Sequence, residues 1–333
     1  MRAWAVMRCA PIDEGPLALV DRAVPTPAPD EVRVRVAVCG VCRTDLHLAE
    51  GDVPPRRRGV VPGHEIVGMI DAVGARVSRR HIGERVGVGW LRSVCGSCRY
   101  CAAGHHNLCA SPSFTGWDAD GGFAEYAVVP EDATYLLPDG FDDTIAAPLL
   151  CAGIIGYRAL RRAEVPPGGR LGIYGFGASA HLTAQVALHE GAVVHVLTRS
   201  EEARRHALSL GASSAGGAFD TPPEPLDSAI LFAPAGSLVP AALAALDRGG
   251  TLALAGIHLT DVPPLHYQEH LFYEKQLRSV TANTWRDGEE LLALAAAIPL
   301  RVDTVPFAFE EADRALRALA HDEITGAAVL RLR

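Results

Sequence analysis

The sequence predicts an α/β protein with two domains, one rich in β-strands and one built on a doubly wound parallel sheet. Three observations support this fold class. The chain of 333 residues is longer than a single hydrophobic core usually serves. Its opening third alternates short β-like runs with glycine and proline, whereas from about residue 169 apolar strand, glycine turn and helix repeat in order. Strands and helices that alternate in this way predict a parallel sheet.

The clearest strand of the opening third is at residues 32–38, where valines alternate with Arg33 and Arg35 to give one apolar and one polar face. In the repeat of strand, turn and helix that begins at about residue 169, we expect strands at residues 171–174, 193–198, 228–232 and 251–255. We expect helices at 178–190 and 201–210. The proline-rich residues 221–225 indicate a surface loop. After about residue 282 the chain returns to helix and short strand, and it ends in a strand at 327–332.

The composition is that of a globular protein with no nucleic-acid partner. Hydrophobic residues make up 49% of the chain and charged residues 21%. A net charge of -8 argues against phosphate binding, which draws on clustered basic residues, and the run Arg56, Arg57, Arg58 is interpreted as a solvated loop. The single lysine, Lys275, leaves little room for Schiff-base or lysine-base mechanisms.

Neither a membrane partner nor secretion is expected. The longest apolar runs, such as residues 291–300, are too short and too polar-flanked to span a bilayer. The first nine residues lack the apolar core and cleavage site of a secretory signal. We therefore expect a cytoplasmic protein, in which the eight cysteines are not paired in disulfides.

Four of these cysteines, Cys95, Cys98, Cys101 and Cys109, stand in one loop at spacings of two, two and seven intervening residues. Four thiolates in so short a stretch suit a closed tetrahedral zinc site. An iron–sulfur cluster is the chemical alternative, but ferredoxin-type spacings differ. The loop therefore predicts a structural zinc ion, whereas Cys9 and Cys39 are interpreted as small core residues.

A second set of candidate ligands is Cys42, His64 and Cys151. Two cysteines and one histidine with an open fourth position form the catalytic zinc pattern found in alcohol dehydrogenase. Each of these residues taken alone is weak evidence for a metal site, because a single buried cysteine or a histidine beside a glycine-rich turn more often has a structural role.

The motifs around these residues resemble the zinc-containing medium-chain alcohol dehydrogenase family over essentially the whole chain. The matching segments are residues 40–45 (GVCRTD), 62–68 (PGHEIVG), 73–74 (VG), 83–88 (GERVGV), 122–126 (GFAEY) and the four-cysteine loop. Residues 148–153 (PLLCAG) are most similar to the cinnamyl-alcohol-dehydrogenase-like and bacterial branches. The resemblance implies a GroES-like catalytic zinc domain at 1–151, completed by 283–333, and a Rossmann cofactor domain at 152–282. It also implies a homodimer or homotetramer, for which residues 278–282 are the candidate edge strand.

The resemblance further implies roles for the residues of the second set. Cys42, His64 and Cys151 would hold the catalytic zinc, Glu65 would stand close behind it as a transient ligand, and Asp45 would fix the imidazole of His64. The open position would bind the oxygen of the substrate, where zinc acts as a Lewis acid.

Thr44 and His47 would form the proton route. By resemblance, Thr44 takes the hydroxyl proton and passes it through the cofactor ribose to His47 near solvent. For Thr44 and His47 the alternative is an ordinary turn and surface position, and for Glu65 it is a structural carboxylate.

A glycine fingerprint follows a predicted strand and opens a predicted helix, as dinucleotide binding requires. Gly175 permits the tight turn, Gly177 lets the backbone approach the pyrophosphate, and Ala180 replaces the third glycine. By resemblance Arg43 would reach the same pyrophosphate. Ala327 stands where the family often has an arginine, so that contact is missing.

The end of the second cofactor-domain strand predicts a preference for NADP(H) over NAD(H). An NAD site places an acid about 20 residues beyond the fingerprint, and Thr198 stands there instead. Arg199 can pair with a 2′-phosphate, and Ser200 with the next helix N-terminus can donate hydrogen bonds. The alternative is an Arg199 that simply faces water.

The sequence thus predicts a zinc-dependent oxidoreductase that transfers hydride between NADP(H) and a small primary alcohol or aldehyde. One alternative is a polyol or thiol-conjugated-aldehyde dehydrogenase of the same fold that uses NAD(H). Another is a non-catalytic, cofactor-binding relative, which the presence of every metal ligand disfavours. Trp90 and Trp117 are candidate pocket walls, which would favour a flat, apolar substrate, or else ordinary aromatic residues.

Overall fold

The computed structural model describes residues 1–256 and 259–332, and the chain divides into two compact units. The first unit contains Met1–Cys151 and Ala282–Arg333, and the second contains Ala152–Thr281. Each unit has its own sheet and its own buried core.

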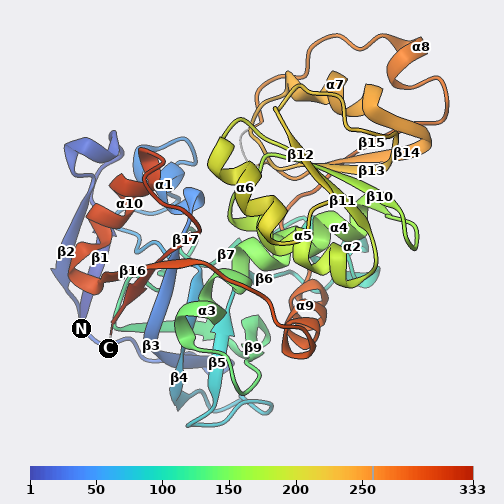
Figure 1. Ribbon diagram of the computed structural model, residues 1–333. Coiled ribbons are helices and arrows are strands. Elements are labelled where there is room, and N and C mark those ends of the chain that lie inside the picture. The colour runs from blue at the N-terminus through green and yellow to red at the C-terminus, as the bar shows by residue number, and fades with distance from the viewer. Residues whose placement is uncertain (257–258, 333) are drawn as a thin grey trace. The chain divides into compact units, whose positions relative to one another are not determined.

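The first unit is built on a seven-stranded sheet in the order β16-β17-β3-β4-β5-β9, with β8 also paired to β3 (Figure 1). The bounds are β3 Glu31–Val41, β4 Glu65–Val73, β5 Arg85–Val88, β8 Tyr126–Pro130, β9 Thr134–Leu136, β16 Thr304–Ala308 and β17 Ala327–Arg331. The strands predicted at 32–38 and 327–332 are confirmed. The valines of β3 are buried and Arg35 is exposed, as the alternation predicted.

Two small sheets and several short helices complete this unit. The sheets pair β1 (Arg2–Val6) with β2 (Leu17–Asp21), and β6 (Leu91–Ser93) with β7 (Ser113–Phe114). The helices are α1 Arg43–Glu50, α2 Arg99–Ala102, α3 Asp143–Pro148, α9 Trp285–Ala297 and α10 Ala312–Ala320, with single turns η1 Ile12–Glu14, η2 His106–Leu108, η3 Glu131–Ala133 and η5 Phe309–Glu311.

The second unit is a six-stranded parallel sheet in the order β12-β11-β10-β13-β14-β15 (Figure 1). Numbered within the unit, this is the order 3-2-1-4-5-6 of the Rossmann fold, so the predicted fold class is confirmed. The strands are β10 Arg170–Tyr174, β11 Val193–Leu197, β12 Ser214–Gly216, β13 Leu226–Leu231, β14 Leu246–Leu254 and β15 Gln276–Ser279, and the helices are α4 Ile154–Ala163, α5 Ala178–His189, α6 Glu201–Ser209, α7 Leu238–Ala245 and α8 Tyr267–His270.

Most of the predicted elements of this unit agree with the structure to within a few residues. The four predicted strands correspond to β10, β11, β13 and β14, and the two predicted helices to α5 and α6. The edge strand was placed too late, because β15 ends at Ser279 and Ala282 already has a φ of 46°. The short strand β12 was not predicted, since three small residues carry no alternation.

One helical run, Asp143–Ala163, is long and apolar enough by composition to be a candidate membrane span. It consists of α3, a π turn η4 (Leu149–Gly153) and α4. Within the part of the chain that the structure describes, 72% of its apolar window is buried inside the protein. Core helices of globular proteins have this character, so we interpret the run as core.

The two cysteines that were expected to be small core residues differ in the structure. Cys39 is fully buried in β3. Cys9 is exposed, because it lies in the turn between β1 and η1 and not in a strand. The prediction for Cys9 was therefore wrong.

Candidate metal centres and cofactor site

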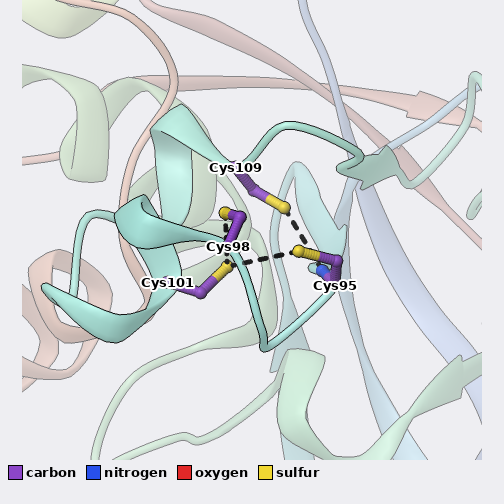
Figure 2. Close-up of side chains that lie close together, drawn as sticks. All are labelled: Cys95, Cys98, Cys101 and Cys109. Atoms are coloured by element: carbon purple, nitrogen blue, oxygen red, sulfur yellow. Dashed lines mark hydrogen bonds between the residues drawn. The ribbon is translucent and has the colours of Figure 1, made fainter.

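The four cysteines of the short loop converge on one point, as Figure 2 shows. Their sulfur atoms all lie within 4.8 Å of one another. The Sγ atom of Cys101 is 3.5 Å from that of Cys98 and 3.9 Å from that of Cys95. Four sulfurs at the Zn–S distance of about 2.3 Å from a tetrahedral centre would be roughly 3.8 Å apart. The donor set therefore fits zinc.

Local backbone structure places these sulfurs. Cys98 is the N-cap of α2, and Cys109 follows directly after η2. The left-handed φ of 71° at Gly96 gives the tight turn between the first two cysteines. Backbone N–H groups of Ser97 and Cys98 hydrogen-bond to the Cys95 sulfur and lower the pKa of its thiol to about 6. The thiolate of Cys95, the form that binds metal, is therefore favoured, whereas burial raises the pKa of Cys101 to about 12.

A second cluster brings together Cys42, His64, Glu65 and Cys151, whose ligand atoms also lie within 4.8 Å of one another. Cys42 is the N-cap of α1, and its Sγ lies 3.5 Å from the Nε2 of His64. Glu65 is the first residue of β4 and His64 directly precedes the strand, and both are buried. Cys151 lies in the π turn η4, which interrupts the α3–α4 run. Such π turns occur often at functional sites.

Asp45 holds the first two ligands of this cluster together. Its buried carboxylate accepts hydrogen bonds from the backbone N–H of Cys42 at 3.0 Å and of Gly63 at 2.9 Å. The same carboxylate lies 3.5 Å from the Nδ1 of His64. Asp45 therefore orients the imidazole so that Nε2 faces the cluster.

Glu65 reaches the cluster because the opposite residue on β3 is a glycine. Gly40 pairs with Glu65 across the two strands. A Cβ atom at Gly40 would lie only 1.8 Å from the Oε2 atom of Glu65. The side chain of any other residue at this position would displace the carboxylate. This steric requirement explains why the motif has glycine at position 40.

The protonation of the cluster is set by burial and by its close neighbours. Cys42 has a pKa well below its usual range, because Cys151 hydrogen-bonds to its sulfur and His64 lies beside it. The same hydrogen bond, together with burial, raises the pKa of Cys151. Burial and the charge of Cys42 raise the pKa of Glu65. Two sulfurs from half-buried cysteines, one buried imidazole and one buried carboxylate form a donor set that fits zinc.

Thr44 and His47 lie three residues apart on α1, on one side of the helix. The backbone N–H of Thr44 donates to the sulfur of Cys42 at 3.2 Å, which places Thr44 beside the metal cluster. The Nδ1 of His47 lies 2.8 Å from the Oδ2 of Asp52. Sequence reasoning missed Asp52, because the contact depends on the turn at Gly51, where φ is 94°.

Of the two candidate tryptophans, Trp90 contacts the second cluster directly and Trp117 stacks on Trp90. Trp90 meets His64 edge to face, with ring centroids 4.9 Å apart. Trp90 also stacks on Phe114 at 5.0 Å and on Trp117 at 6.0 Å. Phe114 completes this aromatic stack and was missed, because its two-residue strand β7 shows no pattern.

The glycine fingerprint lies where the strand order of the second unit reverses. Gly175 follows β10 with a φ of 85°, and a Cβ there would lie 2.9 Å from Ala233, which comes after β13. Gly177 is the N-cap of α5, and a Cβ there would meet nothing within 4 Å. Ala180 is fully buried in the helix. Open α/β sheets bind ligands at the carboxyl ends of the strands where the strand order reverses, which is the position of this fingerprint.

The next predicted cofactor residues follow β11. Thr198 is buried and comes directly after the strand, whereas Arg199 and Ser200 are exposed. The hydroxyl of Ser200 accepts a hydrogen bond from the N–H of Ala203 at 3.2 Å and so caps α6.

The two remaining candidates lie in the first unit. Arg43 is the first residue of α1 and forms an ion pair with Asp322. Ala327 begins β17 and is buried.

Comparisons with known proteins agree with this arrangement. Residues 28–139 match the model of the alcohol dehydrogenase GroES-like domain. A protein of Mycobacterium tuberculosis named "probable alcohol dehydrogenase AdhA" is 57% identical over 99% of this chain and 97% of its own length. The chain belongs to the zinc-containing medium-chain alcohol dehydrogenase family. Membership makes it an NAD(P)-dependent oxidoreductase of the alcohol dehydrogenase type with a four-cysteine structural and a Cys/His/Glu catalytic zinc site.

Two further relatives of this family show how far the similarity extends. An alcohol dehydrogenase of Geobacillus stearothermophilus is 33% identical over 98% of this chain and 99% of its own length. The solved structure of a cinnamyl alcohol dehydrogenase from Sorghum bicolor has a TM-score of 0.89 at 27% identity, and the match covers 99% of this chain and 97% of that one.

We expect two zinc ions per chain, because each cluster has a complete donor set. Elemental analysis of the purified protein measures this number. The Cys98→Ser variant should lose one zinc and at least about 2 kcal/mol of unfolding free energy, since binding at a structural site is part of the folding energy. The His64→Ala variant should stay folded but lose at least about a hundredfold in kcat/KM. A wild-type stoichiometry of one zinc would contradict one of the two assignments.

Proposed function

We propose that this chain interconverts primary alcohols and aldehydes that have an apolar or aromatic body, with NADP(H) as the preferred cofactor. The observation that carries this proposal is the convergence of Cys42, His64 and Cys151, with an aromatic stack against the buried histidine. The stack offers flat apolar surface beside the metal ligands. Family membership supports the reaction class.

In this proposal Cys42, His64 and Cys151 hold the catalytic zinc, and Glu65 supplies a further oxygen close by. Zinc bound there would supply Lewis-acid stabilisation of the negative charge that develops on the substrate oxygen. Asp45 keeps the imidazole of His64 in the binding orientation through its contact with Nδ1.

The proton route is assigned to Thr44 and His47. The hydroxyl of Thr44 accepts the proton of the alcohol as it gives up its own, and His47 receives a proton at Nε2 for release to solvent. Asp52 accepts the proton on Nδ1 of His47 in a hydrogen bond of 2.8 Å and so leaves Nε2 free of hydrogen in the neutral imidazole. A base that is oriented by a third group in this way is a common feature of acid–base catalysis.

The cofactor is assigned to two parts of the chain. The turn at Gly175 and Gly177 presents the N-terminus of α5 to the pyrophosphate. By family resemblance, Arg43 is assigned to the same group. The 2′-phosphate is assigned to Thr198, Arg199 and Ser200. Thr198 occupies the position where an NAD site has an acid, so no carboxylate there repels the phosphate.

We expect kcat/KM to be roughly ten- to a hundredfold higher with NADPH than with NADH, the range that one charge-assisted contact supplies. In the Arg199→Ala variant this ratio should fall about tenfold, with little change in the NADH value. Steady-state kinetics with both cofactors measure the ratio. A wild-type enzyme that prefers NADH would show that the phosphate site is misassigned.

The substrate class is tested with a panel of aldehydes and alcohols. Aromatic aldehydes such as cinnamaldehyde should have a kcat/KM about two- to tenfold above that of short aliphatic aldehydes, because aromatic contacts add that much. The Trp117→Ala variant should lose this advantage while its aliphatic rates serve as the internal control. Equal or greater efficiency with sorbitol would overturn the assignment and favour a polyol dehydrogenase.

We also propose that the protein is a homodimer or homotetramer that pairs through the edge of the second unit's sheet. The edge strand β15 carries Leu277, which is 37% exposed. The preceding segment exposes Tyr267, Phe272 and Tyr273. An uncovered strand edge beside exposed aromatic residues favours pairing with a second copy.

Light scattering at micromolar concentration should therefore give at least twice the chain mass of 35.2 kDa. The Leu277→Lys variant should shift the protein toward the monomer, because a charged residue on an edge strand opposes pairing. Leu208→Lys on α6 is the matched control, since Leu208 is 49% exposed and lies away from this edge. A stable wild-type monomer would contradict the proposal.

A further inference from the structure

A pocket of about 350 Å³ lies in the first unit, between the end of β1 with the turn that follows it and the loop that follows α1. Small-molecule sites in proteins have volumes of about 300 to 1,000 Å³, so this pocket can hold a small ligand. None of its residues belongs to the metal clusters or to the glycine fingerprint. The lining residues are Val6, Met7, Arg8, Cys9, Pro55, Arg57 and Arg58.

The two walls of this pocket are held together by the fold. The backbone N–H of Val6 donates to the oxygen of Val60 at 3.0 Å, which joins the end of β1 to the end of the loop. Cys9 packs against Gly51, where a Cβ atom would lie only 2.8 Å from the Cβ of Cys9. The pocket is therefore formed by backbone pairing and close packing and does not depend on its arginine side chains.

The charged side chains that line the pocket are all arginines. Arg8, Arg57 and Arg58 line it, and none of the described residues around it is a carboxylate. The chain as a whole has a net charge of -8, so this local excess of positive charge runs against the rest of the molecule. The arginine run is exposed, as expected of a solvated loop, but two of its members share a cavity with Arg8. Three like charges around one cavity repel one another unless an anion lies among them.

Neighbouring carboxylates offset only part of this charge. Arg8 pairs with Glu14 at 3.2 Å, but both side chains are more than half exposed, so water weakens the pair. Arg57 pairs with Asp120. Within the part of the chain that the structure describes, Arg58 forms no ion pair and no side-chain hydrogen bond. The pocket therefore keeps a net positive charge.

We propose that this pocket binds the phosphate group of a small molecule, either free phosphate or a phosphate monoester. A guanidinium presents a planar set of N–H donors that fits two phosphate oxygens at once. Arg8 and Arg58 come from opposite walls, and the two charges of a phosphate dianion match both, which a single carboxylate does not. Val6 and Pro55 add apolar surface for the body of an ester. The site is independent of the metal and cofactor sites.

Cys9 provides a reporter inside the pocket. It is exposed and lines the cavity, but it is not one of the proposed phosphate contacts. The rate at which iodoacetamide alkylates Cys9 in the zinc-loaded protein is followed by mass spectrometry of the peptide that contains it. Inorganic phosphate and glycerol 2-phosphate are titrated as probes, each against sodium chloride at equal ionic strength. Phosphate bound at the cofactor site does not contribute to this local signal.

We expect both probes to slow the alkylation of Cys9 in a saturable way, with a midpoint at roughly 1 mM, the affinity that a few charge-assisted contacts supply. A lower midpoint for glycerol 2-phosphate would assign the site to an organic phosphate, and equal midpoints would assign it to free phosphate.

The Arg58→Ala variant should raise this midpoint about tenfold, because one charge-assisted contact is lost. Arg56→Ala is the matched control, since it removes the same charge from the same run. The guanidinium of Arg56 lies over Trp117 and pairs with Asp118, and it does not line the pocket. Its midpoint should stay within about twofold of the wild-type value. Circular dichroism melts show that both variants are folded.

A second measurement tests the charge of the pocket without a ligand. Iodoacetate is an anion and iodoacetamide is neutral, and both react with the same thiolate of Cys9, so the ratio of their rates reports local charge and not the pKa of the thiol. The ratio should fall about twofold in Arg58→Ala, as expected for one unit charge acting through water. High salt should abolish this difference between the variant and the wild type.

Two outcomes would overturn the proposal. One is alkylation of Cys9 that phosphate slows no more than sodium chloride does. The other is a midpoint in Arg58→Ala equal to that of the wild type, which would mean that the arginines do not contact the phosphate. Neither measurement involves turnover, so these outcomes are separate from any failure of the proposed alcohol and aldehyde chemistry.

Discussion

The catalytic unit depends on one buried carboxylate. Asp45 accepts the N–H of Cys42 from the start of α1 and the N–H of Gly63 from the approach to β4, and it faces the imidazole of His64. It therefore fixes two metal ligands from different elements with one side chain. Removal of the Asp45 carboxylate would leave these two N–H groups without an acceptor in the interior, which costs about 1 to 3 kcal/mol per group in other proteins.

The same burial explains why the cluster suits a divalent cation. Burial raises the pKa values of Asp45 and Glu65, and Cys42 and Cys151 share a proton between their sulfurs. The cluster has more carboxyl and thiol groups than imidazoles. Some of those groups therefore stay protonated, which limits the negative charge in the protein interior. A divalent cation is the alternative partner for the same donors, because it balances their charge once the protons leave.

The sequence predicted what local spacing and short motifs encode. The four-cysteine loop lies within one turn-rich segment, so its spacing alone indicated the site. Cys151 could be assigned only through the family resemblance, because a π turn far along the chain brings it to Cys42. Asp52 and Phe114 could not be predicted, since one depends on the turn at Gly51 and the other on stacking between separate loops.

One loop connects the two functions assigned to the catalytic unit. Residues 51–59 follow α1, and the N–H of Val53 donates to the oxygen of His47, the residue assigned to proton release. The next residue, Pro54, accepts the indole N–H of Trp117 at 2.8 Å. Arg56 lies over the same indole, 4.4 Å from the ring centroid, and pairs with Asp118. The aromatic stack and the histidine are thus anchored to the same short segment. Under the proposed function, a displacement of this loop would therefore move the residue assigned to the substrate wall and the histidine assigned to proton release together.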